Sequence, residues 1–273
     1  MPDNPTYDAL GPTRTFWNSS PCNGQETLEL RRAYRYRSEI WLPGMIRRIA
    51  GEHPEILEIG CGMGTDGLEF CAALPSDGSY IGIDYSNESV AAAKQAETEA
   101  EGTLNVKPTF QTGNAEALDF EDNSRACVFS FGVLHHTANE FKAFDEIHRV
   151  LKPGGKAYIF LYRKWSPKVT TAKFLRAVQK TLDFVFRTER YLYRLVKGRH
   201  FEGLFGTMIL ECFGVPYMKW YGKAEMRRMV SKFQINALYP IGYNLPWFHS
   251  KPEALTPFGY YWGIEIEKRA EAD

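Results

Sequence analysis

Strand-like runs and helical stretches alternate along the first part of the chain. Five runs predict buried strands: residues 56–59, 80–83, 109–111, 126–131 and 157–162. Apolar positions at helical spacing predict helices at residues 66–74, 89–100 and 139–151, the last ending in a turn at 152–155. Such alternation is typical of a parallel sheet with crossover helices on both faces. Two more strand-like segments, residues 234–238 and 260–267, follow later.

The segment before the first strand has two parts. Residues 1–24 are rich in Pro, Asn, Gly and Ser, which predicts an arm or loop. Its Phe16-Trp17 and Pro21-Cys22 pairs could cover a pocket. Between residues 26 and 49, apolar and aromatic positions recur at helical spacing and Pro43 suits a helix start, so we expect two short helices there.

Residues 164–233 interrupt the alternation with helical, aromatic and basic sequence, which predicts an inserted cap. A helical wheel puts basic residues on one side of its first helix: Lys173, Arg176, Lys180 and Arg187. The apolar residues fall opposite: Phe174, Leu175, Val178, Leu182, Val185 and Phe186. We expect this apolar side to be buried within the protein. Further aromatic residues of the cap would help to enclose a chamber: Tyr191, Tyr193, Phe201, Phe205 and Phe213.

Charge is distributed unevenly, although the 273 residues carry a formal net charge of zero. Residues 1–150 contain 12 Lys and Arg against 23 Asp and Glu, and the remainder contains 21 against 10. A basic cap could hold an anionic, partly apolar substrate, rest on anionic lipid, or contact RNA. We favour the first. RNA ranks last because the overall charge is neutral and no RNA-binding module is recognisable.

The remaining composition suits an ordinary globular domain with one sizeable core, because 44% of the residues are hydrophobic. Five scattered cysteines lack the pairing or His partners of a zinc or redox site, so we expect mostly buried, reduced thiols. No apolar run approaches the ~18 residues needed to span a bilayer, and the N-terminus lacks the pattern of a signal peptide. We therefore expect a cytoplasmic protein.

A glycine run, Gly60-Cys61-Gly62-Met63-Gly64, joins the first predicted strand to a helix. Open α/β sheets bind ligands at this edge, and small residues let the backbone approach a cofactor. Gly62, Gly64 and Gly67 also satisfy the GxGxxG pattern of nicotinamide-binding domains. Asp84 ends the next strand and can accept hydrogen bonds from two ribose hydroxyls, which fits either cofactor.

Five segments together resemble the signatures of class I S-adenosylmethionine (SAM)-dependent methyltransferases. ILEIGCGMGTDG, IGIDYS, TGNAEAL, FSFGVLHHT and VLKPGGKAYIFLY occur in that family's order and spacing, between residues 54 and 162. The chain looks most similar to the small-molecule branch of the ubiquinone-biosynthesis type, with a methyltransferase domain of the 11/25 kind. The terminal FGYYWGIEIEKR resembles the last, antiparallel strand of that family.

The resemblance implies a Rossmann-like α/β fold with a seven-stranded, mostly parallel, doubly wound sheet and an antiparallel last strand. N-terminal helices would precede it, and a helical cap would follow the fifth strand. We divide the chain into an N-terminal arm with helices (residues 1–50), a SAM-binding core (51–163 and 234–273) and a substrate cap (164–233).

The resemblance also assigns residues to the methyl donor. Around its amino-acid tail it places Glu58, Gly60, Cys61, Gly62, Gly64, Thr65 and Asp66. Asp84 would bind the ribose and Tyr85 the adenine, which Asn114, Ala115 and Glu116 would border. The floor would consist of Phe131, Gly132 and Val133. Tyr36 and Arg37 would cap the donor, unless they form an ordinary helix surface.

Four residues are candidates for catalysis or acceptor binding. His135 and His136 follow the fourth strand, where an imidazole can act as a general base, although a structural pair is equally compatible with the pattern. His136 is preferred because it lies further beyond the strand. Tyr162 and Arg163 end the fifth strand, where Arg163 could bind a carboxylate or phosphate, or close a salt bridge. No residue cluster predicts a metal, although a phosphate-bearing substrate could bring Mg²⁺.

The predicted function is transfer of a methyl group from SAM to an O, N or C nucleophile of a small metabolite, which leaves S-adenosylhomocysteine. DNA adenine and protein-glutamine substrates are disfavoured, because the FSFGV segment lacks the Asn-Pro-Pro-Tyr type of motif. Two alternatives stay open: an NAD(P)-dependent oxidoreductase, and a non-catalytic or membrane-peripheral SAM-binding protein. The oligomeric state and the acceptor stay open as well.

Overall fold

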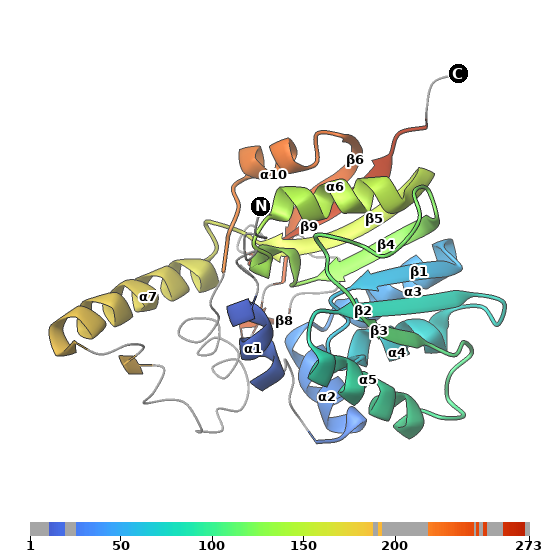
Figure 1. Cartoon of the computed structure of the whole chain (residues 1–273), viewed down its shortest axis with the longest axis horizontal. Coiled ribbons are helices and arrows are strands. Elements are labelled where there is room, and N and C mark those ends of the chain that lie inside the picture. The colour runs from blue at the N-terminus through green and yellow to red at the C-terminus, as the bar shows by residue number, and fades with distance from the viewer. Residues whose placement is uncertain are drawn as a thin grey trace, which may run out of the picture.

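A seven-stranded sheet forms the centre of the molecule (Figure 1). Its order is β3-β2-β1-β4-β5-β9-β6. The strands are β1 (Glu55–Ile59), β2 (Ser79–Asp84), β3 (Thr109–Thr112), β4 (Arg125–Phe131), β5 (Leu151–Tyr162), β6 (Phe233–Ile241) and β9 (Tyr261–Lys268). Strands β1 to β5 pair in parallel, whereas β9 runs antiparallel to both β5 and β6. The predicted sheet, including its antiparallel last strand, is confirmed.

The computed structural model describes residues 11–19, 26–187, 191–192, 218–242, 244–245, 248–249 and 259–270. Its helices are α1 (Gly11–Ser19), α2 (Leu28–Ser38), α3 (Leu42–Glu52), α4 (Thr65–Ala73), α5 (Asn87–Glu99), α6 (Glu140–Val150), α7 (Pro167–Phe186) and α10 (Lys223–Met229), with a 3₁₀ turn η1 (Leu134–His136). Strands β7 (Asn244–Leu245) and β8 (Phe248–His249) form a separate two-stranded pair. None of the described helices is long and apolar enough to cross a membrane.

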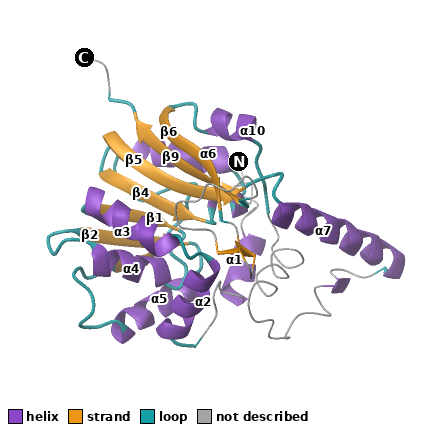
Figure 2. Cartoon of the chain, turned by 180° about the vertical axis from the view of Figure 1, so that it is seen from behind, coloured by secondary structure: helices purple, strands orange, loops and turns teal. Residues whose placement is uncertain are grey.

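Two apolar layers cover the two faces of the sheet (Figure 2). One layer contains side chains of α3, α4 and α5, and the other contains side chains of α6 and α10. Strand β5 contributes side chains to both layers, because successive side chains of a strand point to opposite faces of the sheet. Tyr158 and Phe160 belong to the first layer, whereas Ile159 and Leu161 belong to the second. Both faces are therefore buried, as in other doubly wound folds.

Polar caps start several helices close to the carboxyl ends of strands. Ser86 Oγ accepts a hydrogen bond from the N–H of Ser89 at 3.0 Å and begins α5 just after β2. Ser166 Oγ accepts from the N–H of Val169 at 3.2 Å and begins α7 shortly after β5. Such side chains satisfy backbone donors that a helix start leaves unpaired. The caps fix where each chain segment turns back across the edge of the sheet.

The N-terminal segment departs from the sequence prediction. Residues 11–19 form helix α1, not part of an arm or loop. Phe16 is buried, and the Arg14 guanidinium lies 4.0 Å from the centre of the Tyr85 ring. These tertiary contacts stabilise a helix that the local Pro- and Asn-rich composition disfavours. Pro21 and Cys22 lie outside the described residues.

The predicted turn at residues 152–155 is incorporated into β5. Leu151 already pairs with Arg125 of β4, and the register then shifts before Cys127 pairs with Lys156. Gly154 has a φ of 76°, in the left-handed region that favours glycine. The Pro-Gly-Gly sequence therefore forms an irregularity within a strand, and β5 begins earlier than expected.

Helix α7 is present, but its predicted orientation is wrong for part of the apolar side. Phe174, Val185 and Phe186 are exposed by 67%, 62% and 53%. The Lys173 ammonium lies instead over the Trp220 ring, 4.7 Å from its centre. Long basic side chains can cover apolar surface with their methylene stems, and here they occupy the inner side of the helix. Tyr193, Phe201, Phe205 and Phe213 lie outside the described residues.

Candidate active site

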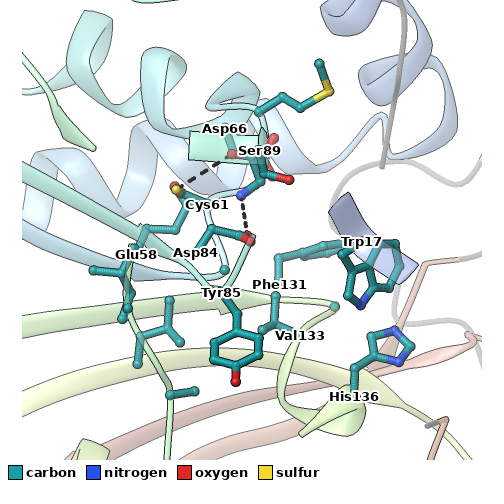
Figure 3. Close-up of a pocket in the computed structure, with 18 of the residues that line it drawn as sticks. Trp17, Glu58, Cys61, Asp66, Asp84, Tyr85, Ser89, Phe131, Val133 and His136 are labelled. Atoms are coloured by element: carbon teal, nitrogen blue, oxygen red, sulfur yellow. Dashed lines mark hydrogen bonds between the residues drawn. The ribbon is translucent and has the colours of Figure 1, made fainter. Parts of the chain in front are cut away.

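A pocket opens at the carboxyl edge of the parallel strands (Figure 3). Its empty volume is about 1330 Å³ including the open mouth. Residues at or just after the ends of β1, β2 and β3 form one part, which we call the glycine end: Glu58, Gly60, Gly62, Asp84, Tyr85, Asn114 and Ala115. Aromatic side chains form the other part, the ring end: Trp17, Phe131, His136, Tyr162 and Tyr261.

The glycine run forms a tight turn after β1. Gly60, Gly62 and Gly64 all have positive φ, of 81°, 53° and 80°. The N–H groups of Gly60 and Cys61 both donate to the Ile83 carbonyl, at 2.7 and 2.9 Å, which ties the turn to β2. A Cβ placed on Gly62 would meet no atom within 4 Å. The turn therefore offers bare backbone to the pocket at this point.

Asp84 links the glycine turn to the start of α5. Its carboxylate accepts from the N–H of Gly62 at 2.9 Å and from the N–H of Ser86 at 2.8 Å. Burial raises the pKa of Asp84, and these N–H donors oppose the shift. The structure thus brings Asp84 and the glycine turn together, as the sequence analysis expected.

Glu58 is a buried carboxyl group at the same end. It accepts a hydrogen bond from the Tyr80 hydroxyl. Burial, together with the negative charge of Asp66, raises the pKa of Glu58 to about 8. Asp66 itself binds Arg35, whose Nη2 lies 2.5 Å from Oδ2. The Arg35 guanidinium lowers this pKa but is itself bound by Asp66, so the raised pKa still favours the protonated form of Glu58.

The adenine side of the prediction is reproduced in part. Tyr85, Asn114 and Ala115 line the pocket, together with Ser89. Glu116, which was also assigned to the donor, does not line it. Its carboxylate accepts instead from the N–H groups of Ala138 and Asn139, at 2.8 and 3.0 Å. Glu116 therefore holds the loop that leads into α6.

Three other donor assignments fall outside the pocket lining: Gly64, Tyr36 and Arg37. Gly64 precedes α4, and a Cβ there would lie 3.0 Å from Ala93 and Phe110, so it serves close packing. The Tyr36 hydroxyl donates to the Thr65 carbonyl at 3.3 Å and supports the turn from behind. Arg37 lies on the exposed side of α2. Cys61, Thr65, Asp66, Phe131, Gly132 and Val133 do line the pocket.

The ring end is built from stacked aromatic side chains. Tyr162 and Tyr261 are paired across β5 and β9, and their rings stack with centres 5.1 Å apart. Phe131 meets Tyr261 edge to face at 4.8 Å. Trp17 of α1 reaches across to His136 of η1, with ring centres 5.3 Å apart. Figure 3 shows Trp17 and His136 side by side at this end. These rings give the pocket apolar walls around one imidazole.

Two of the predicted catalytic residues, His135 and Arg163, do not line the pocket. His135 is fully buried beside Tyr162, with ring centres 4.1 Å apart. Burial, with His136 and Lys168 nearby, lowers the pKa of His135 well below its usual value, so it is neutral. The Arg163 Nε donates to the Gly259 carbonyl at 2.6 Å. Arg163 follows Tyr162 directly and therefore points away from the face that Tyr162 serves.

Sequence reasoning missed several pocket residues: Arg35, Met63, Ser89, Thr137 and Tyr261. It predicted Trp17 only as part of a segment that could cover a pocket. Arg35 lies four residues after Arg31, which is buried, so helical spacing alone would have placed both on the inner side of α2. Tyr261 gives no comparable signal, because its position depends on how β9 pairs with β5.

Comparison with known proteins agrees with the fold and the glycine turn. Residues 56–155 match the methyltransferase domain family. A SAM-dependent methyltransferase from Aquifex aeolicus superposes with a TM-score of 0.53 and 15% identity, covering 85% of this chain and 93% of that one. The PH0226 protein of Pyrococcus horikoshii gives 0.56 and 17%, covering 91% and 94%. The fold is that of Rossmann-like methyltransferases, and residues 56–155 are similar to the methyltransferase domain family.

Curated relatives match over about 100 residues of the chain. A ubiquinone/menaquinone biosynthesis C-methyltransferase of Geotalea daltonii is 35% identical over 107 residues, which are 38% of this chain and 43% of the relative. A demethylmenaquinone methyltransferase of Lactococcus lactis is 36% identical over 101 residues, 37% of this chain and 39% of the relative. The match thus spans less than half the length of either relative.

The family implies SAM as methyl donor, and the glycine end fits that molecule. Open space over Gly62 suits close approach of a ligand to the backbone. Glu58 is a buried carboxyl that an ammonium group can ionise, and Asp84 presents a carboxylate at the edge of the adjacent strand. Among the described residues no cluster of His, Cys, Asp and Glu forms a metal site.

Proposed function

We propose that this protein transfers a methyl group from SAM to an O, N or C nucleophile of a small, partly apolar molecule. The observation that carries the proposal is the continuity of a single pocket. At one end it presents the glycine turn with Glu58 and Asp84, and at the other it presents aromatic walls around His136. A donor at the glycine end would therefore point its reactive group toward an acceptor at the ring end.

SAM, when bound, supplies an electrophilic methyl group on a sulfonium. The protein then has to hold donor and acceptor in line and exclude water. Glu58 and the backbone at Gly62 would bind the amino-acid tail, and Asp84 would accept hydrogen bonds from the ribose hydroxyls. Tyr85, which is held under Arg14, would pack on the adenine.

At the ring end, His136 is placed to accept the proton that an O–H or N–H acceptor loses when it is methylated. Trp17 contacts this imidazole and limits its rotation. The stacked rings of Tyr162 and Tyr261 exclude water from the reacting atoms. An electron-rich carbon nucleophile would not need this base and would need only to be held in line with the methyl donor.

The observations on the acceptor concern only its size and polarity. Names of the curated relatives refer to methylation of quinone precursors, so a small-molecule acceptor is consistent with them. Aromatic walls favour an acceptor that is partly apolar. An anionic group on it would meet Arg35, which lines the pocket but is already bound by Asp66. The anionic part of the earlier expectation therefore has little support among the described pocket residues.

Thermal unfolding with S-adenosylhomocysteine and with NAD tests the proposal directly. A ligand that binds the folded state alone raises the melting temperature in proportion to ln(1 + [L]/Kd). We expect S-adenosylhomocysteine to stabilise the protein and NAD to have no effect. Stabilisation by NAD alone would favour the oxidoreductase alternative and end the methyltransferase proposal.

The Asp84→Asn variant identifies the site responsible. Loss of charge-assisted hydrogen bonds costs about 1.5–3 kcal/mol, so we expect S-adenosylhomocysteine to bind about 10- to 100-fold more weakly. Asp119→Asn is a suitable control, because Asp119 is exposed and does not line the pocket. Equal affinity in the Asp84 variant and the control, measured by calorimetry, would remove Asp84 from the site.

A further inference from the structure

Helix α7 presents an apolar face to its surroundings. Eight exposed residues share a 140° arc of the helix, in which Val178 is half-buried, as judged at about 100° per residue: Pro167, Thr170, Thr171, Phe174, Ala177, Thr181, Phe184 and Val185. None of these side chains is charged. Phe174, Phe184 and Val185 are exposed by 67%, 87% and 62%. Exposed apolar surface of this extent on one element indicates an interaction surface.

The helix also extends away from the sheet, as Figure 1 shows. Only Val169 and Ala172 are buried along its length, both in its first two turns. Its far half therefore contributes little to the core. The helix starts five residues after Tyr162, at the same edge of the sheet as the pocket.

Positive charge borders the apolar face. Lys173 and Lys180 lie on one flank, and the helix carries Lys168 and Arg176 besides, with Asp183 as its single acidic residue. The Lys173 Nζ donates to the Lys164 carbonyl at 3.2 Å, so this flank is anchored to the chain. Asp183 faces inward, where it accepts from the N–H of Tyr191 at 2.7 Å. The surface around the apolar face is thus cationic.

We propose that α7 docks on the surface of an anionic phospholipid bilayer. Phe174 and Phe184 insert at the boundary between headgroups and acyl chains, and the exposed Lys180 lies among the lipid phosphates. Helices that combine an aromatic face with flanking lysines bind membranes in this way. A second copy of the chain is the less suitable occupant, because pairing two α7 helices would bring like charges together.

Co-sedimentation of the full chain with lipid vesicles tests docking. The vesicles consist of phosphatidylcholine alone or of phosphatidylcholine mixed with phosphatidylglycerol. We expect binding to the mixed vesicles that is about tenfold tighter than to neutral ones and that weakens with added salt. The Phe174→Gln/Phe184→Gln variant should bind at least about tenfold more weakly, because the apolar contribution is lost.

Phe141→Gln is the matched control, because Phe141 is also an exposed phenylalanine, at 40%, but lies on α6. It should bind vesicles like the wild type. Retained stabilisation by S-adenosylhomocysteine shows that each variant is folded, and vesicle binding is measured without any donor, so it is independent of the proposed reaction. No binding to either vesicle, or equal binding by the double variant, would overturn the proposal. So would a concentration-dependent dimer that the double variant loses, since it would make a second copy the occupant.

Discussion

Glu58 shows how a single buried side chain prepares the pocket for a cation. Its carboxyl group is 2% exposed, accepts from Tyr80 and lies near the negative charge of Asp66. Each of burial and like charge favours the neutral form, whereas the nearby Arg35 is engaged by Asp66. An ammonium group that enters the pocket would reverse this balance. Ligand binding and deprotonation of Glu58 should therefore be coupled.

Calorimetry can measure that coupling. At pH 7 Glu58 holds its proton in the free protein, because its pKa of about 8 lies above the pH. Binding of S-adenosylhomocysteine, which carries an ammonium group, should release this proton, so the observed heat should vary with the ionisation enthalpy of the buffer. The Glu58→Gln variant should bind about tenfold more weakly and release no proton from this site. Equal proton release in the variant would show that another group is responsible.

Among single residues, the sequence analysis located correctly those whose position follows from being at the end of a strand. Glu58, Gly62 and Asp84 follow the ends of consecutive strands, so the order of the elements was enough to place them at one edge. Arg163 and Glu116 do not line the pocket, because alternation along a strand and local hydrogen bonds decide where such side chains point. Those details depend on tertiary packing.

Between elements, the turn after β1 is fitted closely to the loop after β4. A Cβ on Gly60 would lie 2.1 Å from Val133 Cγ2, far closer than atoms can approach, and the φ of Gly60 is 81°. Any side chain at this position would therefore displace the loop that leads to η1 and His136. The requirement for glycine here combines close packing with a left-handed backbone.

A double-mutant cycle tests this packing. Gly60→Ala should lower the free energy of unfolding by about 3 kcal/mol or more, since a left-handed alanine alone costs about 1–2 kcal/mol and the clash adds to it. Adding Val133→Ala should recover part of the loss, with a coupling energy of about 1 kcal/mol or more in urea denaturation. Gly44→Ala is the control, because a Cβ there meets nothing within 4 Å and alanine favours the helix. Simple additivity at Gly60 and Val133 would contradict the proposed contact.

Helix α1 connects the two ends of the pocket. Arg14 lies over Tyr85 at the glycine end, and Trp17 contacts His136 at the ring end. The sequence composition predicted a loop here, because the stabilising contacts are made with residues far along the chain. A helix held at both ends of a pocket should slow the exit of a bound molecule.

Dissociation kinetics can test this role of α1. The contact between Arg14 and Tyr85 is of the cation–π type, worth about 0.5–1 kcal/mol, so Arg14→Ala should release S-adenosylhomocysteine about two- to fivefold faster. Its association rate should change little. Thr15→Ala, on the exposed side of α1, should behave like the wild type. An unchanged dissociation rate in Arg14→Ala would show that α1 does not retain the ligand.

For the whole molecule, the opposite charges of its two halves are partly explained by their contacts. Lys152 pairs with Glu55 at 3.2 Å, and Lys232 pairs with Asp145 at 2.7 Å. Lys219 likewise pairs with Glu140. Each cation belongs to the basic part of the chain and each acid to the acidic part. Exposed pairs of this kind contribute little to stability, about 0–1 kcal/mol each, but they account for charge that the sequence alone assigned to a ligand.

The order of the strands was predictable because it follows from alternation, handedness and the resemblance of the terminal segment. The orientation of α7 was not. Its wheel pattern is amphipathic, and burial of the apolar side was the natural expectation, yet Lys173 packs on Trp220 and Phe174 is exposed. Which side of an amphipathic helix faces inward depends on partners that lie elsewhere in the chain.

The pH dependence of global stability should reflect Glu58. Its folded-state pKa of about 8 lies above the ordinary value of 4.5, so the folded state binds more protons between these pH values. Stability contributed by this group is therefore fully present below about pH 4.5 and is lost as the pH rises to about 8. Other groups titrate too: Glu39 and Asp84 are also raised, whereas His135 is lowered and acts in the opposite direction. A comparison with Glu58→Gln isolates the one contribution.

Relative to that variant, the unliganded wild type should lose up to about 1.4 kcal/mol of unfolding free energy per pH unit across this window, and the difference should level off above about pH 8. Urea denaturation from about pH 5 to about pH 9 measures it. Saturating S-adenosylhomocysteine should flatten the dependence, because the bound ammonium group ionises Glu58 at lower pH. A wild-type curve parallel to the variant's at every pH would mean that Glu58 ionises near its ordinary value, and the proposed coupling between ligand binding and proton release would then be wrong.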